Sequence, residues 1–462
     1  MQNDLLFQNF NLAQGYNTSL NPYLSRPGES SAALNCDFTT IGSVAKFAGY
    51  ASVYTGLSAS DVLGLYNFKT SAGASVFLAV NGTVLYYLSG STWTSALTGL
   101  TTGLKAEFTT HLDTAIMVNG TDVAKKSTNG SSWSTLGGTP PVAKYTVTFD
   151  NKVYMFNITS HPSRMQWSDD GTIETWTSTN FQDIITDVGS GDQITGATVN
   201  NNSLLIFKNY STWKWDTYNL VVMDANTGCR SPRSIASRNN WTFWLSHNGV
   251  MATDGGRPRK ISKQIDDIVA GITDITACVG WVMDEYYYLY VGTANGITNC
   301  LLCYNYNNNT WAYKSMQDSV KVAAILTSGS GASQFSYFGN SGGQVYKFRT
   351  GLDDNSSAIP FELITAPDVS KAPHRQKDYK EFIVFLDGTS LPGVDVLYSI
   401  DYNDFQPLGH AQSLITKLRF PSDATGYSIR IMYKSIGTKG QQKIRGHMCF
   451  GKVKTGDLLD VR

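Results

Sequence analysis

The chain has 462 residues, only 16% of them charged, with 36 Lys and Arg residues against 36 Asp and Glu residues. This length is more than one compact core usually contains, so we expect several domains or one ring of repeats with an appendage. The 42 Gly, 25 Tyr and 10 Trp residues favour β-structure with many turns over a helical bundle. With a net charge of zero, the chain as a whole gives no indication of a polyanionic partner.

Residues 1–50 are predicted to form an N-terminal arm that precedes the repeats. Asn21-Pro22 and Pro27-Gly28 interrupt regular secondary structure. The short apolar segments around them indicate an arm that lies across another surface of the protein. The same residues contain no hydrophobic signal segment, so we expect a cytosolic setting in which the six scattered cysteines stay reduced.

A unit of alternating strands recurs from about residue 54, and its clearest copy is 145–176. Apolar and polar residues alternate before and after the turn at Asp150-Asn151, and a third strand is expected at 164–168, ahead of Trp176. Successive side chains of a strand point to opposite faces, and Asn or Asp tolerates the positive φ of a tight turn. The unit is therefore predicted to be an antiparallel meander.

The copies are spaced like the blades of a propeller. Trp93, Trp133 and Trp176 end three successive copies and lie 40 and 43 residues apart. This interval matches the period of about 40 to 50 residues that is typical of propeller blades. Further strand-rich copies follow up to residue 350. We therefore predict an all-β chain with a β-propeller of six or seven blades at residues 51–350.

One segment of this region predicts a helix. Ile261, Ile265, Ile268 and Val269 approximate a period of 3.6 residues across 262–270. Residues on both sides return to the alternation of strands. We expect a short helix inserted on one blade.

The ends of two copies, 127–133 and 168–176, resemble the Asp-box turn of sialidase-like propellers. In such a turn Asp or Asn bonds its own backbone, Gly takes the left-handed conformation and Trp packs beneath, so its role is structural. A sialidase also needs a cluster of arginines to hold the carboxylate of its sugar. Only Arg26 and Arg164 occur before residue 230.

Residues 351–375 are predicted to be a linker, and 376–462 a small C-terminal β-sandwich or jelly roll, because short strands alternate there with turn residues. Residues 371–462 contain 14 Lys and Arg against 9 Asp and Glu. Both a solvated basic surface and a nucleic-acid contact remain open for this region. Its basic patch begins with Lys371, His374, Arg375, Lys377 and Lys380.

No combination of residues predicts catalysis or a bound cofactor. Cys300 and Cys303 form one Cys-x-x-Cys pair, but in a strand they point to opposite faces, and a second pair is missing. The six histidines are isolated, and there is no phosphate-binding loop motif. We predict no catalytic, cofactor or metal residues and no enzyme. No apolar run approaches the ~20 residues of a transmembrane helix, so we predict no membrane insertion.

Segments in both the arm and the repeats suggest a family. They are 21–28 (NPYLSRPG), 35–37 (NCD), 42–46 (GSVAK), 168–176 (SDDGTIETW), 202–208 (NSLLIFK), 228–235 (GCRSPRSI) and 243–250 (FWLSHNGV). In order and spacing the chain resembles the tail hub or nozzle proteins of short-tailed bacteriophages, also called packaged-DNA stabilisation proteins. It departs from the family pattern at 46–49, where Lys-Phe-Ala-Gly stands in place of an Arg-Pro-Gly.

This resemblance implies a structural protein of the virion, made in the host cytoplasm and built into the phage tail. It implies a homo-oligomer, a ring of six copies below the portal and its adaptor, the head-completion protein. The lumen of the ring would hold DNA without sequence specificity, and a tail needle, plug or fibre protein would close it. The low charge density agrees with a channel that does not grip DNA, because each neutralising Lys or Arg strengthens phosphate binding.

Two alternatives from other classes stay open. A carbohydrate-binding propeller or tail adhesin would use exposed aromatic residues, and Tyr286-Tyr-Tyr-Leu-Tyr290 could supply them. An Asp-box glycosidase is the enzyme alternative, and the missing arginines weaken it.

Overall fold

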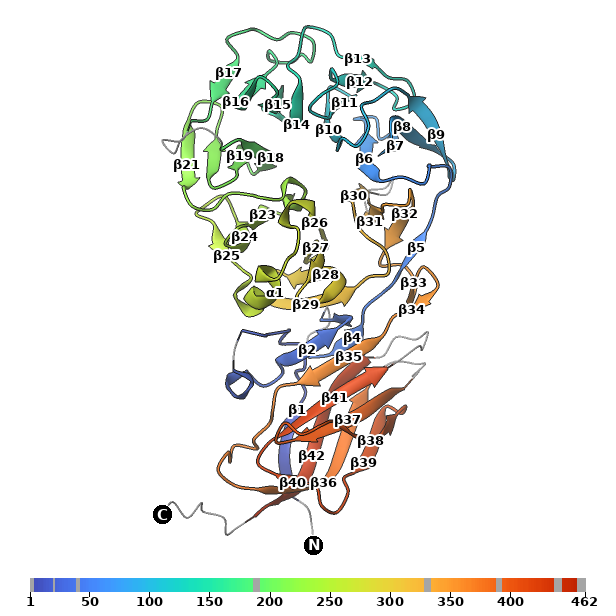
Figure 1. Ribbon diagram of the computed structural model, residues 1–462, viewed down its shortest axis with the longest axis vertical. Helices are drawn as coiled ribbons and strands as arrows, with labels where there is room; N and C mark the ends of the chain where they lie inside the picture. The colour runs from blue at the N-terminus through green and yellow to red at the C-terminus, as the bar shows by residue number, and fades with distance from the viewer. Residues whose placement is uncertain are drawn as a thin grey trace.

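The computed structural model describes residues 4–19, 21–38, 42–185, 192–327, 334–387, 393–435 and 443–454. Within these ranges nearly every element is a strand, and the single α-helix is α1 (Asp266–Ala270). Figure 1 shows a ring of sheets above and a smaller lobe of strands below. None of the helices in these ranges is long and apolar enough to cross a membrane. The predicted all-β fold class is confirmed.

The upper lobe is the predicted β-propeller, and the described residues form seven blades. Each blade is an antiparallel set of four strands, and in the first six blades the strands follow one another in sequence from the centre outward (Figure 1). The first five blades are β6 (Val62–Lys69), β7 (Ser75–Asn81), β8 (Val84–Ser89) and β9 (Thr92–Leu97); β10 (Glu107–His111), β11 (Thr114–Val118), β12 (Lys125–Ser127) and β13 (Ser134–Thr135); β14 (Ala143–Phe149), β15 (Lys152–Ile158), β16 (His161–Trp167) and β17 (Phe181–Asp183); β18 (Ile194–Asn200), β19 (Ser203–Lys208), β20 (Thr212–Trp215) and β21 (Leu220–Asp224); and β22 (Ala236–Arg238), β23 (Trp241–Ser246), β24 (Gly249–Thr253) and β25 (Arg259–Lys260).

The last two blades connect the ring to the rest of the chain. They are β26 (Val279–Met283), β27 (Tyr286–Ala294), β28 (Ile297–Asn305) and β29 (Thr310–Ser315); and β30 (Val322–Thr327), β31 (Gln334–Gly339), β32 (Val345–Phe348) and β5 (Tyr50–Ser52). In the seventh blade, β5 pairs antiparallel with β32, and Tyr50 lies opposite Phe348. A strand from the start of the chain thus completes the blade that ends the ring.

The second strand of a blade is buried on both faces, because each blade packs between two others. In β19, Leu204, Leu205, Ile206 and Phe207 are all fully buried. Such a strand is a continuous apolar run without alternation, as strands covered on both sides are. The first and third strands keep more polar positions, as in β16, where Arg164 and Gln166 flank the buried Met165.

The lower lobe consists of two sheets. One contains β3 (Cys36–Asp37), β4 (Val44–Lys46), β42 (Lys443–Val453), β36 (Lys377–Leu386), β39 (Ile415–Arg419), β1 (Asp4–Asn9) and β40 (Thr425–Gly426); the other contains β2 (Ser30–Leu34), β35 (Phe361–Thr365), β41 (Ile429–Ser435), β37 (Val394–Ile400) and β38 (Gln406–Ala411). The sheets face each other, since Tyr433 of β41 and His447 of β42 hydrogen-bond in the core at 2.9 Å. Four strands of this lobe therefore come from residues 1–50, which were expected to form only an arm.

The predicted linker at 351–375 is wrong in part. Phe361–Thr365 is β35, which pairs with β2 on one side and β41 on the other. Asp353–Asp354 (β33) and Ser357–Ala358 (β34) form a further hairpin beside β5. Buried and half-buried residues alternate along β35, as expected for a strand. In the sequence, the three prolines of segment 351–375 made a linker the simpler prediction.

One sheet runs without interruption from the propeller into the lower lobe. Strand β2 lies parallel to β29 of the sixth blade, with Leu34 opposite Tyr313, and antiparallel to β35 of the lower lobe. The result is a nine-stranded sheet. The two lobes also share one hydrophobic core, which includes Ala33, Trp311 and Phe361.

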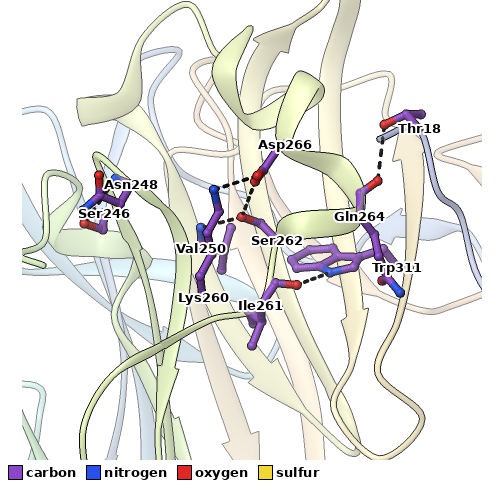
Figure 2. Close-up of polar contacts among 10 residues, drawn as sticks. All are labelled: Thr18, Ser246, Asn248, Val250, Lys260, Ile261, Ser262, Gln264, Asp266 and Trp311. Carbon is purple, nitrogen blue, oxygen red and sulfur yellow. Dashed lines mark hydrogen bonds and ion pairs between the residues drawn. The ribbon is translucent and has the colours of Figure 1, made fainter. Parts of the chain in front are cut away.

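The N-terminal segment is hydrogen-bonded to the propeller beside the predicted helix (Figure 2). The backbone N–H of Thr18 donates to the carbonyl of Gln264 at 2.9 Å, and its hydroxyl oxygen lies 3.4 Å from the same carbonyl. Next to them, Trp311 Nε1 donates to the carbonyl of Ile261 at 2.9 Å. The helical segment, η3 (Lys263–Ile265) followed by α1, connects β25 to β26. It is a connection between two blades, and the prediction that it is inserted on one blade is wrong.

Candidate functional site

A narrow channel follows the axis of the propeller. The innermost strands surround a cavity of about 210 Å³, and all seven blades or the segments leading into them line it. Leu65, Phe108, Thr146 and Ala197 are among the lining residues. In the middle of this wall stands a guanidinium group, that of Arg233.

Arg233 lies on the 3-10 turn η2 (Pro232–Ser234), which leads into the fifth blade. Its Nη1 donates to the carbonyl of Lys321 at 2.8 Å, and its Nη2 donates to the carbonyl of Leu63. Its Nε lies 3.5 Å from Glu107 Oε1, at the start of the second blade. Arg233 therefore reaches across the axis and bonds groups of the first, second and seventh blades. Burial lowers its pKa, and the neighbouring carboxylate of Glu107 acts in the opposite direction.

The turn that presents Arg233 is held from both sides. Ser231 Oγ donates to the carbonyl of Cys278 at 2.7 Å, and Tyr287 Oη donates to the carbonyl of Ser234 at 2.8 Å. Gly280 of β26 lies so close that a Cβ there would meet the Ser234 carbonyl at 2.6 Å. A side chain at position 280 would displace the turn, so glycine is required by this close approach.

A wider funnel opens on one side of Arg233. Its volume is about 460 Å³, and it shares Glu107, Tyr145, Pro232 and Arg233 with the channel. Its wall consists of loops that precede the innermost strands, of the first residues of those strands, and of residues at or after the ends of the second strands. Its polar lining residues are Lys105, Glu107, Asn119, Lys144, Tyr145, Asn157, Gln193, Thr195, Asn209, Arg230, Arg233 and Thr276.

The charge of the funnel is positive. Four cationic residues line it, against the single carboxylate of Glu107. Lys105, Lys144 and Arg230 form no ion pair with any described residue, although Lys105 lies in the field of Glu107 and Asp274. Lys105 is exposed on the wall, yet the atoms around it remove enough water to lower its pKa, and the charge of Arg233 lowers it further. Excess positive charge in a hollow attracts anions.

The two Asp-box-like ends are structural turns, as predicted. Asn129 Oδ1 accepts bonds from the backbone N–H groups of Ser131 and Ser132, at 3.0 and 2.9 Å. Gly130 has a φ of 76°, and Trp133 Nε1 donates to its carbonyl at 2.8 Å. In the third blade Trp176 is buried and makes the corresponding bond to a backbone carbonyl. These turns lie outside the funnel lining.

The aromatic segment 286–290 is not an exposed platform. Tyr286, Tyr287, Tyr288 and Tyr290 are all at most 6% exposed, because β27 lies between β26 and β28 in the shared core. The prediction that these tyrosines could stack on a sugar is therefore wrong. In a strand with one open face, half of these side chains would face outward, but both faces of this strand are covered.

Cys300 and Cys303 lie on β28, opposite Ser315 and Ala312 of β29. Both are buried, and burial raises the pKa of each thiol. No group of three or more His, Cys, Asp or Glu side chains in the described ranges is arranged to hold a metal ion.

The predicted basic patch is only partly a surface. Lys371, His374 and Arg375 are exposed. Lys377 is fully buried, and its Nζ donates to the carbonyls of Ala372 and Tyr427, each at 2.6 Å. It belongs to the structure of the lower lobe, and its assignment to a basic patch is wrong.

The funnel was not predicted from the sequence. Segment 228–235 carries part of the family resemblance, but neither Arg230 nor Arg233 was predicted to be a site residue. Nothing in the linear sequence relates Arg233 to Glu107 or Leu63, which lie 126 and 170 positions away. The only available signal was a pair of arginines around Ser231-Pro232 in a chain with few arginines before it.

No family model matches the sequence, and no curated protein matches it. Solved structures with a similar fold include BamB from Moraxella catarrhalis (13% identity, TM-score 0.40), covering 66% of this chain and 94% of that one. YCF48 bound to D1 peptide has 11% identity and a TM-score of 0.41, covering 66% of this chain and 97% of that one. YCF48 from Cyanidioschyzon merolae has 11% identity and a TM-score of 0.43, covering 65% and 98%. At this level of similarity none of them says what this chain binds.

Proposed function

We propose that this chain is a structural subunit of the tail hub, or nozzle, of a short-tailed bacteriophage. Six copies would form a ring below the portal-adaptor complex, retain the packaged DNA and form its exit channel. A needle, plug or fibre protein would close the ring. The family resemblance of the sequence motivates this proposal, and one structural observation supports it most.

That observation is the rigid junction of the two lobes. The nine-stranded sheet crosses from the sixth blade to the lower lobe through the pair Leu34–Tyr313, so a hinge motion between the lobes would break this pairing. One ion pair crosses the junction, since Arg349 Nη2, directly after β32, lies 2.6 Å from Asp37 Oδ2 of β3. Beside it, Lys314 Nζ of β29 lies 2.7 Å from Asp354 Oδ1 of β33, with both side chains buried. A ring that withstands the pressure of packaged DNA needs subunits of this stiffness.

The outer edges of both lobes expose apolar side chains that a neighbouring copy could cover. In β21, at the rim of the fourth blade, Val221 is 55% exposed and Val222 44% exposed. At the edge strand β39 of the lower lobe, Leu414 and Ile415 are 57% and 63% exposed. Unpaired, apolar strand edges favour association with another chain.

The alternatives have less support. The sugar-binding hypothesis needs exposed aromatic residues, but the tyrosines of 286–290 are buried. The glycosidase reading needs several arginines around one sugar carboxylate. In the described funnel only Arg230 and Arg233 are present, and the guanidinium of Arg233 already bonds backbone carbonyls.

Native mass spectrometry and electron microscopy of the purified chain, alone and mixed with a purified portal-adaptor complex, test the proposal. We expect rings of six that bind one end of the complex. The double variant Val221→Lys/Ile415→Lys should weaken ring formation about tenfold or more, because it places charges on both exposed edges.

Leu112→Lys is the matched control. Leu112 is 56% exposed, but it sits alone at the turn between β10 and β11, so its variant should form rings like the unchanged protein. A chain that stays monomeric and ignores the portal-adaptor complex would overturn the proposal.

A further inference from the structure

We propose that the funnel above Arg233 is a binding site for an acidic peptide segment of a protein partner. This site is separate from the ring contacts of the proposed function, and it does not depend on them. The positive funnel, its amide side chains and its size point to this ligand.

The cations are placed to meet carboxylates. Lys105 and Arg230 come from two different loops and Lys144 from the start of β14, and they have no carboxylate within ion-pair distance among the described residues. Arg233, at the base of the funnel, already donates hydrogen bonds to backbone carbonyls. It therefore contributes positive potential, but its guanidinium is not available for a bidentate pair with a carboxylate. A carboxylate that enters can pair with Arg230 in the bidentate geometry that guanidinium groups favour.

The amide groups are suited to a peptide backbone. Asn119, Asn157, Gln193 and Asn209 line the same wall. The Asn119 amide is already used, because its Nδ2 donates to Asp122 Oδ2 and its Oδ1 accepts from the backbone N–H groups of Thr121 and Asp122. Asn157 Nδ2 donates to the Ile194 carbonyl at 2.6 Å and to Gln193 Oε1 at 3.3 Å. Among the described residues, the Asn209 side chain and Gln193 Nε2 are therefore the amide groups left for a ligand. Amides both donate and accept hydrogen bonds, as a peptide backbone does, whereas a phosphate offers only acceptors.

One buried group of the wall lacks a partner. Thr195 is in the lining and is 6% exposed, and its buried Oγ1 makes no hydrogen bond with the described residues. A buried hydroxyl without a partner is costly, and a ligand in contact with it can supply one.

The size of the funnel selects among anions. A volume of about 460 Å³ is within the range of sites that enclose small ligands and short peptide segments. A DNA duplex is too wide to enter it and could touch only the rim. The lining also includes Leu104, Ile194 and Pro232, whose apolar surfaces can cover the methylene groups of glutamate side chains.

Isothermal titration calorimetry with the full chain tests the proposal. The probe is a pentaglutamate peptide with an acetylated N-terminus and an amidated C-terminus, and the pentaglutamine peptide with the same ends is its uncharged counterpart. We expect the glutamate peptide to bind at least tenfold more tightly than the glutamine peptide, and to bind more weakly at high salt. Lys144→Gln and Arg230→Gln should each weaken the binding about tenfold, since each removes one charge-assisted contact.

Lys69→Gln is the control, because Lys69 is an exposed lysine at the far end of the innermost strand β6 and lies outside the funnel lining. Its variant should bind the glutamate peptide normally. Far-UV circular dichroism checks that each variant is folded. Failure to bind the glutamate peptide, or equal binding by the Arg230→Gln variant, overturns the proposal. So does tighter, Arg230-dependent binding of a 20-base-pair duplex, inorganic phosphate or an oligogalacturonate. Ring formation is measured separately, so failure of one proposal is distinguishable from failure of the other.

Discussion

At the scale of single residues, His447 shows how the fold changes the chemistry of a side chain. It is fully enclosed between the two sheets of the lower lobe. The ring centroids of Phe382 and Phe7 lie 5.1 and 5.8 Å from the centroid of its imidazole ring. Burial lowers its pKa to about 3, because the imidazolium would lose its hydration. The sequence offered only an isolated histidine, and nothing in the residues beside it distinguishes this one from the exposed His374.

This burial predicts a dependence of stability on pH. The unfolded chain binds a proton at His447 below its ordinary pKa of about 6.5, but the folded chain does not until about pH 3. The histidine therefore stabilises the fold above pH 6.5, and that stabilisation declines as pH falls toward 3. Between pH 7 and pH 5 the unchanged protein should lose about 2 kcal/mol more of its unfolding free energy than the His447→Gln variant.

Urea unfolding at both pH values measures this difference. His374→Gln is the control, and its pH dependence should match that of the unchanged protein. If the His447→Gln variant shows the same pH dependence as the unchanged protein, His447 is not responsible.

At the scale of elements, the pair Lys314–Asp354 joins the outer strand of the sixth blade to the hairpin after the seventh. Both side chains are at most 2% exposed, and their Nζ–Oδ1 distance is 2.7 Å. Burial lowers the pKa of Lys314 and raises that of Asp354, so each charge depends on the other to stay in the core.

Removing one partner should destabilise the protein more than removing both. We expect Lys314→Met to reduce the unfolding free energy by about 3 kcal/mol, because Asp354 loses its hydrogen-bonded cation. The double variant Lys314→Met/Asp354→Leu should recover much of that loss, since two apolar residues can replace a buried pair. A double-mutant cycle by urea unfolding measures the coupling. Additive effects of the two substitutions would show that the pair does not hold these elements together.

At the scale of the whole molecule, both lobes contain strands from the N-terminal residues, so neither lobe is complete without them. Strand β5 completes the seventh blade, and β1 to β4 belong to the lower lobe. One hydrophobic core extends through the last blades and both sheets of that lobe. We therefore expect the two lobes to unfold together in one cooperative transition.

The positions of tryptophan and cysteine make this testable. All ten tryptophans lie between residues 93 and 311, in the propeller, whereas Cys36 and Cys449 are buried in the lower lobe. Tryptophan fluorescence and the reactivity of these two thiols should give the same urea midpoint. Thiols that react while the fluorescence is still native would show that the lower lobe unfolds independently.

The repeating part of the chain could be predicted from local signals in the sequence. Strand alternation, turn residues and the spacing of Trp93, Trp133 and Trp176 predicted the blades, and the Asp-box-like ends were recognised as turns, because all these signals are local. The length of the propeller left six or seven blades possible.

How the N-terminal and C-terminal segments pair with the rest of the chain became visible in the folded structure. Residue 34 lies beside residue 313, and residue 50 beside residue 348, so no local pattern could show that the N-terminal segment completes two sheets. The same reason concealed the funnel, because its cations come from positions 105, 144 and 230, which meet only because the blades close into a ring. Burial also depends on neighbours distant in sequence, which is why the tyrosines of 286–290 and Lys377 looked exposed in the sequence and are not.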